Sequence, residues 1–243
     1  MAVFYIAHMY PDLMDLYGDR GNLICLKKRL EWYGHKANIV KVNLHSQVDF
    51  DQYDMLFMGG GSDREQNLVC HDLFKKADSL RASIENGLPM LFVCGAYQLL
   101  GTSYKPSKEK KIAGLSLFNF YTEGREDRLF GNILLKTKLN NEEVTVVGFE
   151  NHSGRTFFAD EDLQPFGLVV KGNGNNGEDR QEGIWYKNLI GTYLHGPILP
   201  KNPVIADFFI NKMLERKNIE NHIKLDDEIE MFAHNQIKDR LLQ

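Results

Sequence analysis

Cys94 lies at the junction of a predicted strand and a predicted helix. The apolar run Met90–Val93 indicates a buried strand, and the residues from Gly95 onward, with Gln98 in the first turns, indicate a helix. A sharp turn from strand to helix holds the side chain between them out at the end of the sheet, beside free helix N–H groups. These groups favour negative charge, so a cysteine at this place forms a nucleophilic thiolate more easily. Taken alone, the motif fits a buried core cysteine equally well.

Two further features follow predicted strands and suit the same chemistry. The strand Leu189–Leu194 ends at His195, and the strand Tyr53–Met58 ends at the triplet Gly59–Gly61. The carboxyl ends of strands in an open α/β sheet line one crevice, so we expect these features to meet at Cys94. An imidazole beside the thiol would raise the thiolate fraction and later protonate a leaving group. An isolated histidine closing a strand is more often structural, so the catalytic interpretation of His195 depends on Cys94.

The glycine triplet is a candidate source of backbone hydrogen-bond donors. Without side chains, the N–H groups of Gly59–Gly61 can approach a substrate oxygen, and with the N–H of Gly95 they could form an oxyanion hole. Ser62 and Glu65 have the spacing of a capping box, which predicts a helix beginning there and adds a favourable dipole. The plainer interpretation of the triplet is a tight strand-to-helix turn, which is common.

The elements that would position these residues alternate between strands and helices up to Gly101. This alternation predicts an α/β fold with an open, mostly parallel central sheet and helices on both of its faces. Before Gly101 the sequence predicts strands at Val3–His8, Asn38–Val42, Tyr53–Met58 and Pro89–Val93, and helices at Gly21–Tyr33, from Ser62 onward, and before Gly87.

After Gly101 the pattern changes to short apolar runs separated by glycines and asparagines. These runs predict additional strands, many of them antiparallel, at Arg128–Leu135, Val144–Glu150, Phe166–Val170 and Gly183–Tyr186. Two further helices are predicted at Pro203–Lys217 and Asp226–Leu241. No repeat, linker or low-complexity segment interrupts the chain, so we expect residues 1–243 to form one domain.

Composition argues against several classes of protein. With 43% hydrophobic and 26% charged residues the chain has the composition of an ordinary globular protein, and its net charge of −4 argues against nucleic-acid binding. No run approaches the roughly 18 apolar residues of a membrane span. Three cysteines and no signal-peptide pattern indicate a reducing compartment, so we expect a cytoplasmic protein.

Several tempting motifs do not carry a function. Gly172–Gly177 matches G-x-G-x-x-G, but a charged turn and a strand follow it, so we interpret it as a mobile hairpin loop rather than a dinucleotide site. The chain has no phosphate-binding loop of the G-x-x-x-x-G-K-[ST] type. Its histidines lack the spacing of metal ligands, so we expect neither a metal nor a cofactor.

The candidate residues lie within blocks that resemble the class I glutamine amidotransferases of the cobyric-acid-synthase (CobB/CobQ-like) type. Within that family the chain is most similar to the GatD-type glutaminase subunits of lipid II isoglutaminyl synthases. The resemblance covers nearly the whole chain and a flavodoxin-like fold is implied. It rests on five blocks in the family's order, namely Leu16–Asn22, Phe57–Gln66, Cys94–Gln98, Gly148–Thr156 and Gly191–Pro197.

This resemblance implies a specific reaction and assigns residues to it. Cys94 would attack the side-chain amide of free glutamine to form a thioester, and His195 would relay protons and help release ammonia. Gly60 and Gly95 would be the oxyanion donors, and Gln98 would touch the bound glutamine. Arg128 would grip the substrate carboxylate, which suits the fork of a guanidinium. Without the family, Arg128 is more simply a surface arginine before a strand.

Two positions depart from the family's pattern. The nucleophile motif more often has glycine where this chain has Ala96, which is tolerable in helical backbone. Many class I enzymes place a glutamate two residues after the catalytic histidine, and here that position is Pro197. The resemblance suggests an acid supplied by a partner subunit, while Asp19 and Glu150 are candidates within the chain.

The resemblance also implies a partner. Ammonia needs an acceptor, and this chain has no ATP-binding loop with which to activate one. A GatD-type subunit would form a heterodimer with a Mur-ligase-like, ATP-dependent subunit (MurT-type). That subunit would activate the α-carboxyl of D-glutamate in the lipid II stem peptide, giving D-isoglutamine for peptidoglycan synthesis. Three alternatives stay open, namely another acceptor such as cobyrinate, a cysteine peptidase of similar fold, and a non-catalytic docking module.

Overall fold

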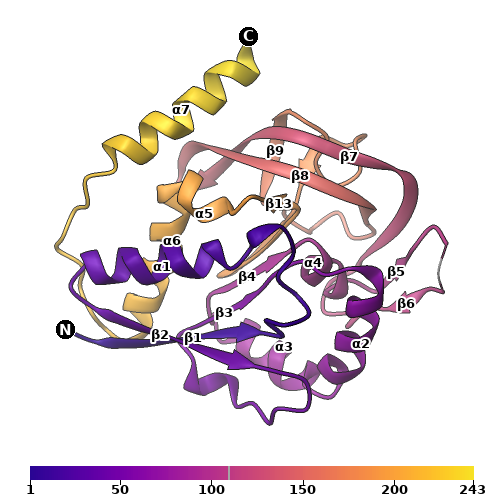
Figure 1. Cartoon of the computed structure of the whole chain (residues 1–243), viewed down its shortest axis with the longest axis horizontal. Coiled ribbons are helices and arrows are strands. Elements are labelled where there is room, and N and C mark those ends of the chain that lie inside the picture. Colours follow the sequence, from indigo (N-terminus) through magenta and orange to yellow (C-terminus); the bar gives the residue numbers. More distant parts are fainter. Residues whose placement is uncertain (109) are drawn as a thin grey trace.

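A six-stranded sheet forms the centre of the protein in the computed structural model, which describes residues 1–108 and 110–243 (Figure 1). Its strand order is β11-β12-β4-β3-β1-β2, and all neighbours are parallel except β11 and β12. The expected open, mostly parallel sheet is therefore confirmed. The strands are β1 (Val3–Met9), β2 (Lys36–Val42), β3 (Met55–Met58), β4 (Met90–Val93), β11 (Ile184–Tyr186) and β12 (Leu189–Thr192).

Helices cover both faces of this sheet, because its central strands are apolar on both sides. Phe57 of β3 belongs to the core that includes α1 (Gly21–Trp32) and α6 (Pro203–Arg216), whereas its neighbour Leu56 belongs to the opposite core. That second core includes α2 (Asp63–Phe74), α3 (Ala77–Glu85) and α4 (Gly95–Leu99). All residues of β3 and β4 are buried, so the strand ends that carry the candidate residues are rigidly placed.

A second, mostly antiparallel sheet is built around two long paired strands (Figure 1). Strand β7 (Phe120–Leu139) pairs with β8 (Glu142–Phe158), and both are far longer than the predicted Arg128–Leu135 and Val144–Glu150. The extra length was missed because most side chains between residues 123 and 130 are exposed, so no apolar alternation marks this part of β7. The other strands are β5 (Ser103–Lys105), β6 (Ile112–Ala113), β9 (Gly167–Lys171), β10 (Gln181–Glu182) and β13 (Leu194–His195).

The remaining helices are short or lie at the end of the chain. The capping box predicted at Ser62 and Glu65 is present and begins α2. Two 3-10 turns, η1 (Leu16–Gly18) and η2 (Phe50–Gln52), and the one-turn helix α5 (Ile198–Lys201) lie in connections, while α7 (Glu228–Leu242) extends from the body at the C-terminus (Figure 1). Among the described residues, no helix combines the length and the apolar character needed to cross a membrane.

The loop Gly172–Gly177 is packed rather than projecting. It joins β9 to the antiparallel β10, as the hairpin prediction requires. The side chains of Asn175 and Asn176 are nevertheless buried, and Asn175 exchanges hydrogen bonds with the backbone of Gly183. The loop therefore forms part of the framework instead of the mobile hairpin that we expected.

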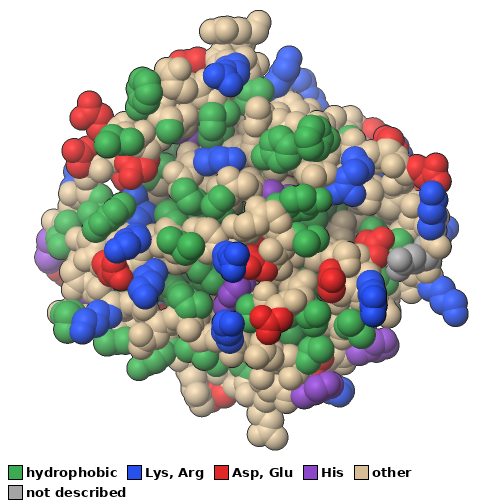
Figure 2. Space-filling view, viewed as in Figure 1, with side chains coloured by type: hydrophobic (Ala, Val, Ile, Leu, Met, Phe, Trp, Pro, Cys, Tyr) green, Lys and Arg blue, Asp and Glu red, His purple; other side chains and the backbone are tan. Residues whose placement is uncertain are grey.

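The charged side chains are mixed over the face shown in Figure 2. Figure 2 shows Lys and Arg interspersed with Asp and Glu over the face in view, with apolar side chains between them. No continuous basic stripe crosses that face.

Candidate active site

Cys94 occupies a strained turn at the carboxyl end of β4. Its backbone has φ +53° and ψ −109°, a conformation that costs a residue with a Cβ about 1–3 kcal/mol. The turn is held because the Cys94 N–H donates to the carbonyl of Thr192, at 2.7 Å, on the neighbouring parallel strand β12. Helix α4 begins at the next residue, so its first N–H groups lie beside the sulfur. The strand-to-helix elbow expected from sequence is present.

His195 comes to the same edge of the sheet as Cys94. After β12 the chain passes into β13, which leaves the central sheet and pairs with β8. A Cβ placed on Gly60 would lie 3.1 Å from Cε1 of His195 and 3.3 Å from Cβ of Cys94. The ends of β3, β4 and β13 therefore converge, with the Gly60 backbone between the two side chains.

The His195 ring is buried, and each ring nitrogen faces a different group. Nδ1 lies 3.0 Å from Oδ1 of Asp19, a carboxylate that is itself fully buried. Nε2 has no hydrogen bond of ordinary geometry, yet the Cys94 thiol is close enough to act on the pKa of the ring. Catalytic pairs are often this loose before substrate binds. Tyr17 covers the outer side, with its ring centroid 4.9 Å from that of His195.

The surroundings of His195 favour its charged form. Burial alone would lower the pKa of His195, but negative charge on Cys94 and the hydrogen bond to Asp19 outweigh burial and raise it. An imidazolium held between a carboxylate and a cysteine can stabilise a thiolate. The arrangement can therefore supply a nucleophile and a proton donor side by side.

The two glycines expected to bind a substrate oxygen are placed differently. The N–H of Gly60 donates to Oδ2 of Asp19 at 2.8 Å, so it is already engaged. Gly95 is the first residue of α4, where an N–H has no partner within its own helix. A Cβ on Gly95 would lie 2.8 Å from the Gln66 side chain, so Gln66 of α2 packs directly against this turn.

Buried acceptors gather around the elbow. Gln98 donates through Nε2 to the hydroxyl of Tyr193, at 3.2 Å, which leaves its Oε1 without a partner among the described residues. Oε1 of Gln66 is unpartnered in the same way. His152 stacks on the Tyr193 ring, with centroids 3.7 Å apart, and its Nδ1 lies 2.7 Å from the carbonyl of Gly154.

His152 is a neutral acceptor in this setting. Burial, together with the nearby charges of Arg155, His195 and Arg128, lowers its pKa to about 3. Because Nδ1 must carry the proton that reaches the Gly154 carbonyl, Nε2 has a lone pair and is unpartnered. Three buried acceptors without donors therefore suit a ligand rich in N–H groups.

Arg128 lies at the edge of this region rather than inside it. It is on β7, next to the bulge where Leu129 pairs with His152. Its exposed guanidinium donates to the side chain and the carbonyl of Asn151, at 2.7 and 2.8 Å. Strand pairing thus brings Arg128 to the rim near His152, with its charge facing solvent.

Two buried glutamates bind backbone and side-chain groups near the strand β13 that carries His195. Both oxygens of Glu150 are occupied by Asn173 and by the N–H of Gly174. Glu182 is fully buried and accepts the Tyr193 N–H, at 2.7 Å, and the Thr192 hydroxyl, at 3.0 Å. Glu182 therefore holds the link through which β12 passes into β13 and His195.

Replacing Glu182 by glutamine should remove a pH dependence of stability. Burial raises the pKa of Glu182 to about 8, whereas in the unfolded chain it is near 4.5. Between these values the folded protein holds a proton that the unfolded chain releases. This group therefore lowers the free energy of unfolding by about 1.4 kcal/mol per pH unit as pH rises. Urea denaturation of both proteins between about pH 5 and pH 8 measures the difference, and parallel pH dependences would contradict this role.

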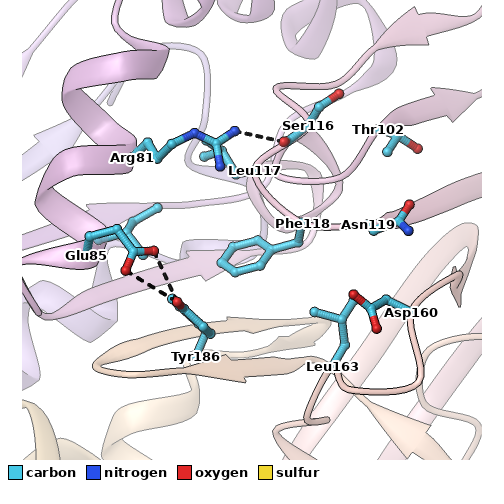
Figure 3. Close-up of a pocket in the computed structure, with 11 residues that line it drawn as sticks. Arg81, Glu85, Thr102, Ser116, Leu117, Phe118, Asn119, Asp160, Leu163 and Tyr186 are labelled. Atoms are coloured by element: carbon cyan, nitrogen blue, oxygen red, sulfur yellow. Dashed lines mark hydrogen bonds between the residues drawn. The ribbon is translucent and has the colours of Figure 1, made fainter.

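A separate cavity of about 490 Å³ lies at the opposite edge of the sheet (Figure 3). Arg81 there donates to the carbonyl of Ser116 at 2.9 Å, and the Tyr186 hydroxyl lies 3.1 Å from Glu85. Tyr186 is at the amino end of the strands, since it pairs with the first residue of β12. None of the candidate catalytic residues lines this cavity.

Residues 5–203 match the CobB/CobQ-like glutamine amidotransferase domain. The chain belongs to this family. The lipid II isoglutaminyl synthase (glutamine-hydrolyzing) subunit GatD of Staphylococcus aureus (strain N315) is 44% identical over 97% of this chain and 95% of that protein. The subunit of the same name from Streptococcus pneumoniae (strain ATCC BAA-255 / R6) is 43% identical over 87% of this chain and 81% of that protein.

A solved structure supports the fold of this CobB/CobQ-like chain. The glutaminase domain of CTPS from Trypanosoma brucei, with bound acivicin, has a TM-score of 0.56 and 13% identity, covering 89% of this chain and 95% of that one. At that identity the likeness concerns the fold alone. The family resemblance and the α/β fold expected from sequence are confirmed, and the chain is a glutamine amidotransferase.

Three residues at the site gained no role from the sequence. Gln66 lies one residue beyond the capping box, which predicts where α2 begins but not that it packs on Gly95. His152 is on β8 of the second sheet and Tyr193 links β12 to β13, so the two rings stack only after both sheets have formed. Their positions in the family blocks Gly148–Thr156 and Gly191–Pro197 were the available signal.

Proposed function

We propose that this chain is the glutaminase subunit of a lipid II isoglutaminyl synthase. It hydrolyses free glutamine and delivers the ammonia to a Mur-ligase-like, ATP-dependent partner in the cytoplasm. The partner amidates the α-carboxyl of D-glutamate in the lipid II stem peptide to D-isoglutamine. The observation that carries the proposal is the convergence of Cys94 and His195 in a chain that shares 44% of its aligned residues with a GatD subunit.

The reaction proceeds through a thioester on Cys94. The thiolate attacks the carboxamide carbon of glutamine, and the C–N bond breaks as His195 gives a proton to the departing nitrogen, which leaves as ammonia. His195 then takes a proton from water, which attacks the thioester and releases glutamate and the thiolate. The N–H of Gly95, the first residue of α4, would stabilise the oxyanion of both steps.

The buried acceptors support glutamine as the substrate. Its carboxamide and its ammonium group both carry N–H donors, which suit the unpartnered Oε1 atoms of Gln66 and Gln98 and Nε2 of His152. Arg128 at the rim supplies the positive charge that an α-carboxylate needs, provided that its guanidinium turns from Asn151. A peptide substrate, whose α-carboxyl is usually an amide, would not need that charge.

Transfer of a labelled amide tests the proposed client. The chain is purified with the protein that accompanies it and supplied with ATP and glutamine labelled with ¹⁵N in the side-chain amide. A lipid II analogue is the acceptor in one reaction and cobyrinate in a parallel one. We expect ¹⁵N in the α-carboxamide of D-isoglutamine, detected by mass spectrometry of the stem peptide. Labelling of cobyrinate instead would overturn the cell-wall assignment while leaving the glutaminase chemistry intact. Cleavage of peptides without turnover of glutamine would overturn both.

A further inference from the structure

Asp19 joins two parts of the candidate site through one carboxylate. Its Oδ1 lies 3.0 Å from Nδ1 of His195, and its Oδ2 accepts the N–H of Gly60 at 2.8 Å. The side chain is fully buried. It reaches this place from the segment between β1 and α1, which is 176 residues from His195 in the sequence.

The bond to His195 has a direct chemical consequence. A histidine that exchanges protons through Nε2 needs a hydrogen on Nδ1, and a carboxylate at Nδ1 fixes that tautomer and stabilises the imidazolium. Pro197, two residues after His195, cannot supply such an acceptor from its side chain. Asp19 occupies the position that the motif itself leaves without an acid.

The bond to Gly60 fixes the glycine loop in relation to the histidine. The Gly60 carbonyl accepts the N–H of Leu16 at 3.1 Å, so both backbone groups of Gly60 bind the segment that carries Asp19. A Cβ on Gly60 would lie 3.4 Å from Oδ2 of Asp19, which shows how closely the loop approaches. Movement of this segment would therefore disturb His195 and the glycine loop together.

Glu150, the other acid within the chain, does not reach His195. Its oxygens are held by the Asn173–Gly174 turn. The histidine near it is His152, whose Nε2 lies 4.0 Å from Oε2 of Glu150. Among the described residues, Asp19 is thus the acid that contacts His195. The other titratable neighbours of His195 are Cys94, Tyr17 and His152.

We propose that Asp19 is a positioning residue of the glutaminase reaction: one oxygen orients His195 and the other holds the Gly60 peptide. This inference rests on the proposed function. It places the third member of the relay within this chain rather than in the partner subunit. Asparagine at position 19 can accept only through its single oxygen, so it cannot serve both N–H groups.

Asp19→Asn should lower kcat for glutamate release by about 10²–10³-fold, with little change in KM, because the imidazole loses its orientation and not its contact with substrate. The basic limb of the pH profile should also move to lower pH by about one unit, since the imidazolium loses its carboxylate. Asp15→Asn is the matched control. Asp15 lies in the same segment and accepts the Arg20 N–H, without touching His195.

Both variants are measured as the isolated chain and with the co-purifying partner, beside Cys94→Ala. Full kcat and an unshifted profile in Asp19→Asn would overturn the inference, as would a defect that disappears when the partner is added. Wild-type protein without glutaminase activity in either state would instead overturn the proposed function. If Asp19→Asn does not fold, the ¹⁵N chemical shifts of the His195 imidazole in the wild type test the inference instead. We expect a proton on Nδ1 at neutral pH, and an unprotonated Nδ1 would contradict the inference.

Discussion

Replacing Cys94 by alanine is expected to lower glutamate release from glutamine by at least about 10⁴-fold. The substitution removes the atom that forms the thioester, and no other group at the site can replace a nucleophile. The fold should persist, because alanine has the same Cβ and the same backbone demands at φ +53°. We expect the free energy of unfolding to change by less than about 1 kcal/mol.

The other two cysteines provide controls for that result. Burial raises the pKa of Cys25 to about 12 and that of Cys70 to about 11, so neither thiol is a competent nucleophile at neutral pH. Cys25→Ala and Cys70→Ala should therefore retain glutaminase activity. Cys94→Ala protein that still releases glutamate, in a preparation free of other glutaminases, would contradict the thioester mechanism.

Replacing His195 by glutamine should have the second-largest effect, a loss of about 10³-fold or more in kcat. The amide can still donate to Asp19, so the loss would arise from proton transfer and not from an unfilled site. Without an imidazolium beside the sulfur, ammonia leaves poorly and the thiolate loses its counter-charge.

The pH dependence of alkylation separates this role from a structural one. With a small alkylating reagent, the wild type should already react at neutral pH, because the imidazolium beside the sulfur stabilises the thiolate that reacts. In His195→Gln the rate should be lower at neutral pH and should rise steeply as the solution becomes alkaline. Identical profiles for the two proteins would show that His195 does not act on Cys94.

The central part of the fold could be predicted because its signals are local. The runs Tyr53–Met58 and Met90–Val93 are apolar on both faces, which is typical of a buried parallel strand, and the capping box at Ser62 marks a helix start. The topology of an open sheet predicts that the ends of β4 and β12 lie at one edge, and β13 then carries His195 out of that sheet to pair with β8.

Long-range polar contacts could not be predicted in the same way. The Asp19–His195 pair depends on a connection that folds back over the sheet edge, and no spacing in the sequence encodes such a contact. The N–H of Gly60 was expected to face a substrate oxygen, but Asp19 binds it instead, because the buried carboxylate needs donors for both oxygens. The loop Gly172–Gly177 is not the mobile hairpin that we expected, since the Gly174 N–H donates to the Glu150 carboxylate and the Asn175 amide donates to the Gly183 carbonyl, partners that only the tertiary structure supplies.

Covalent labelling tests the central claim most directly. A chloroketone analogue of glutamine is incubated with the protein and its partner, and the labelled residue is identified by peptide mass spectrometry, with and without excess glutamine. The expected result is a single adduct on Cys94 that glutamine prevents and that His195→Gln slows. Labelling spread equally over Cys25, Cys70 and Cys94, or labelling of Cys94 that glutamine does not affect, would contradict a glutamine-binding catalytic thiol.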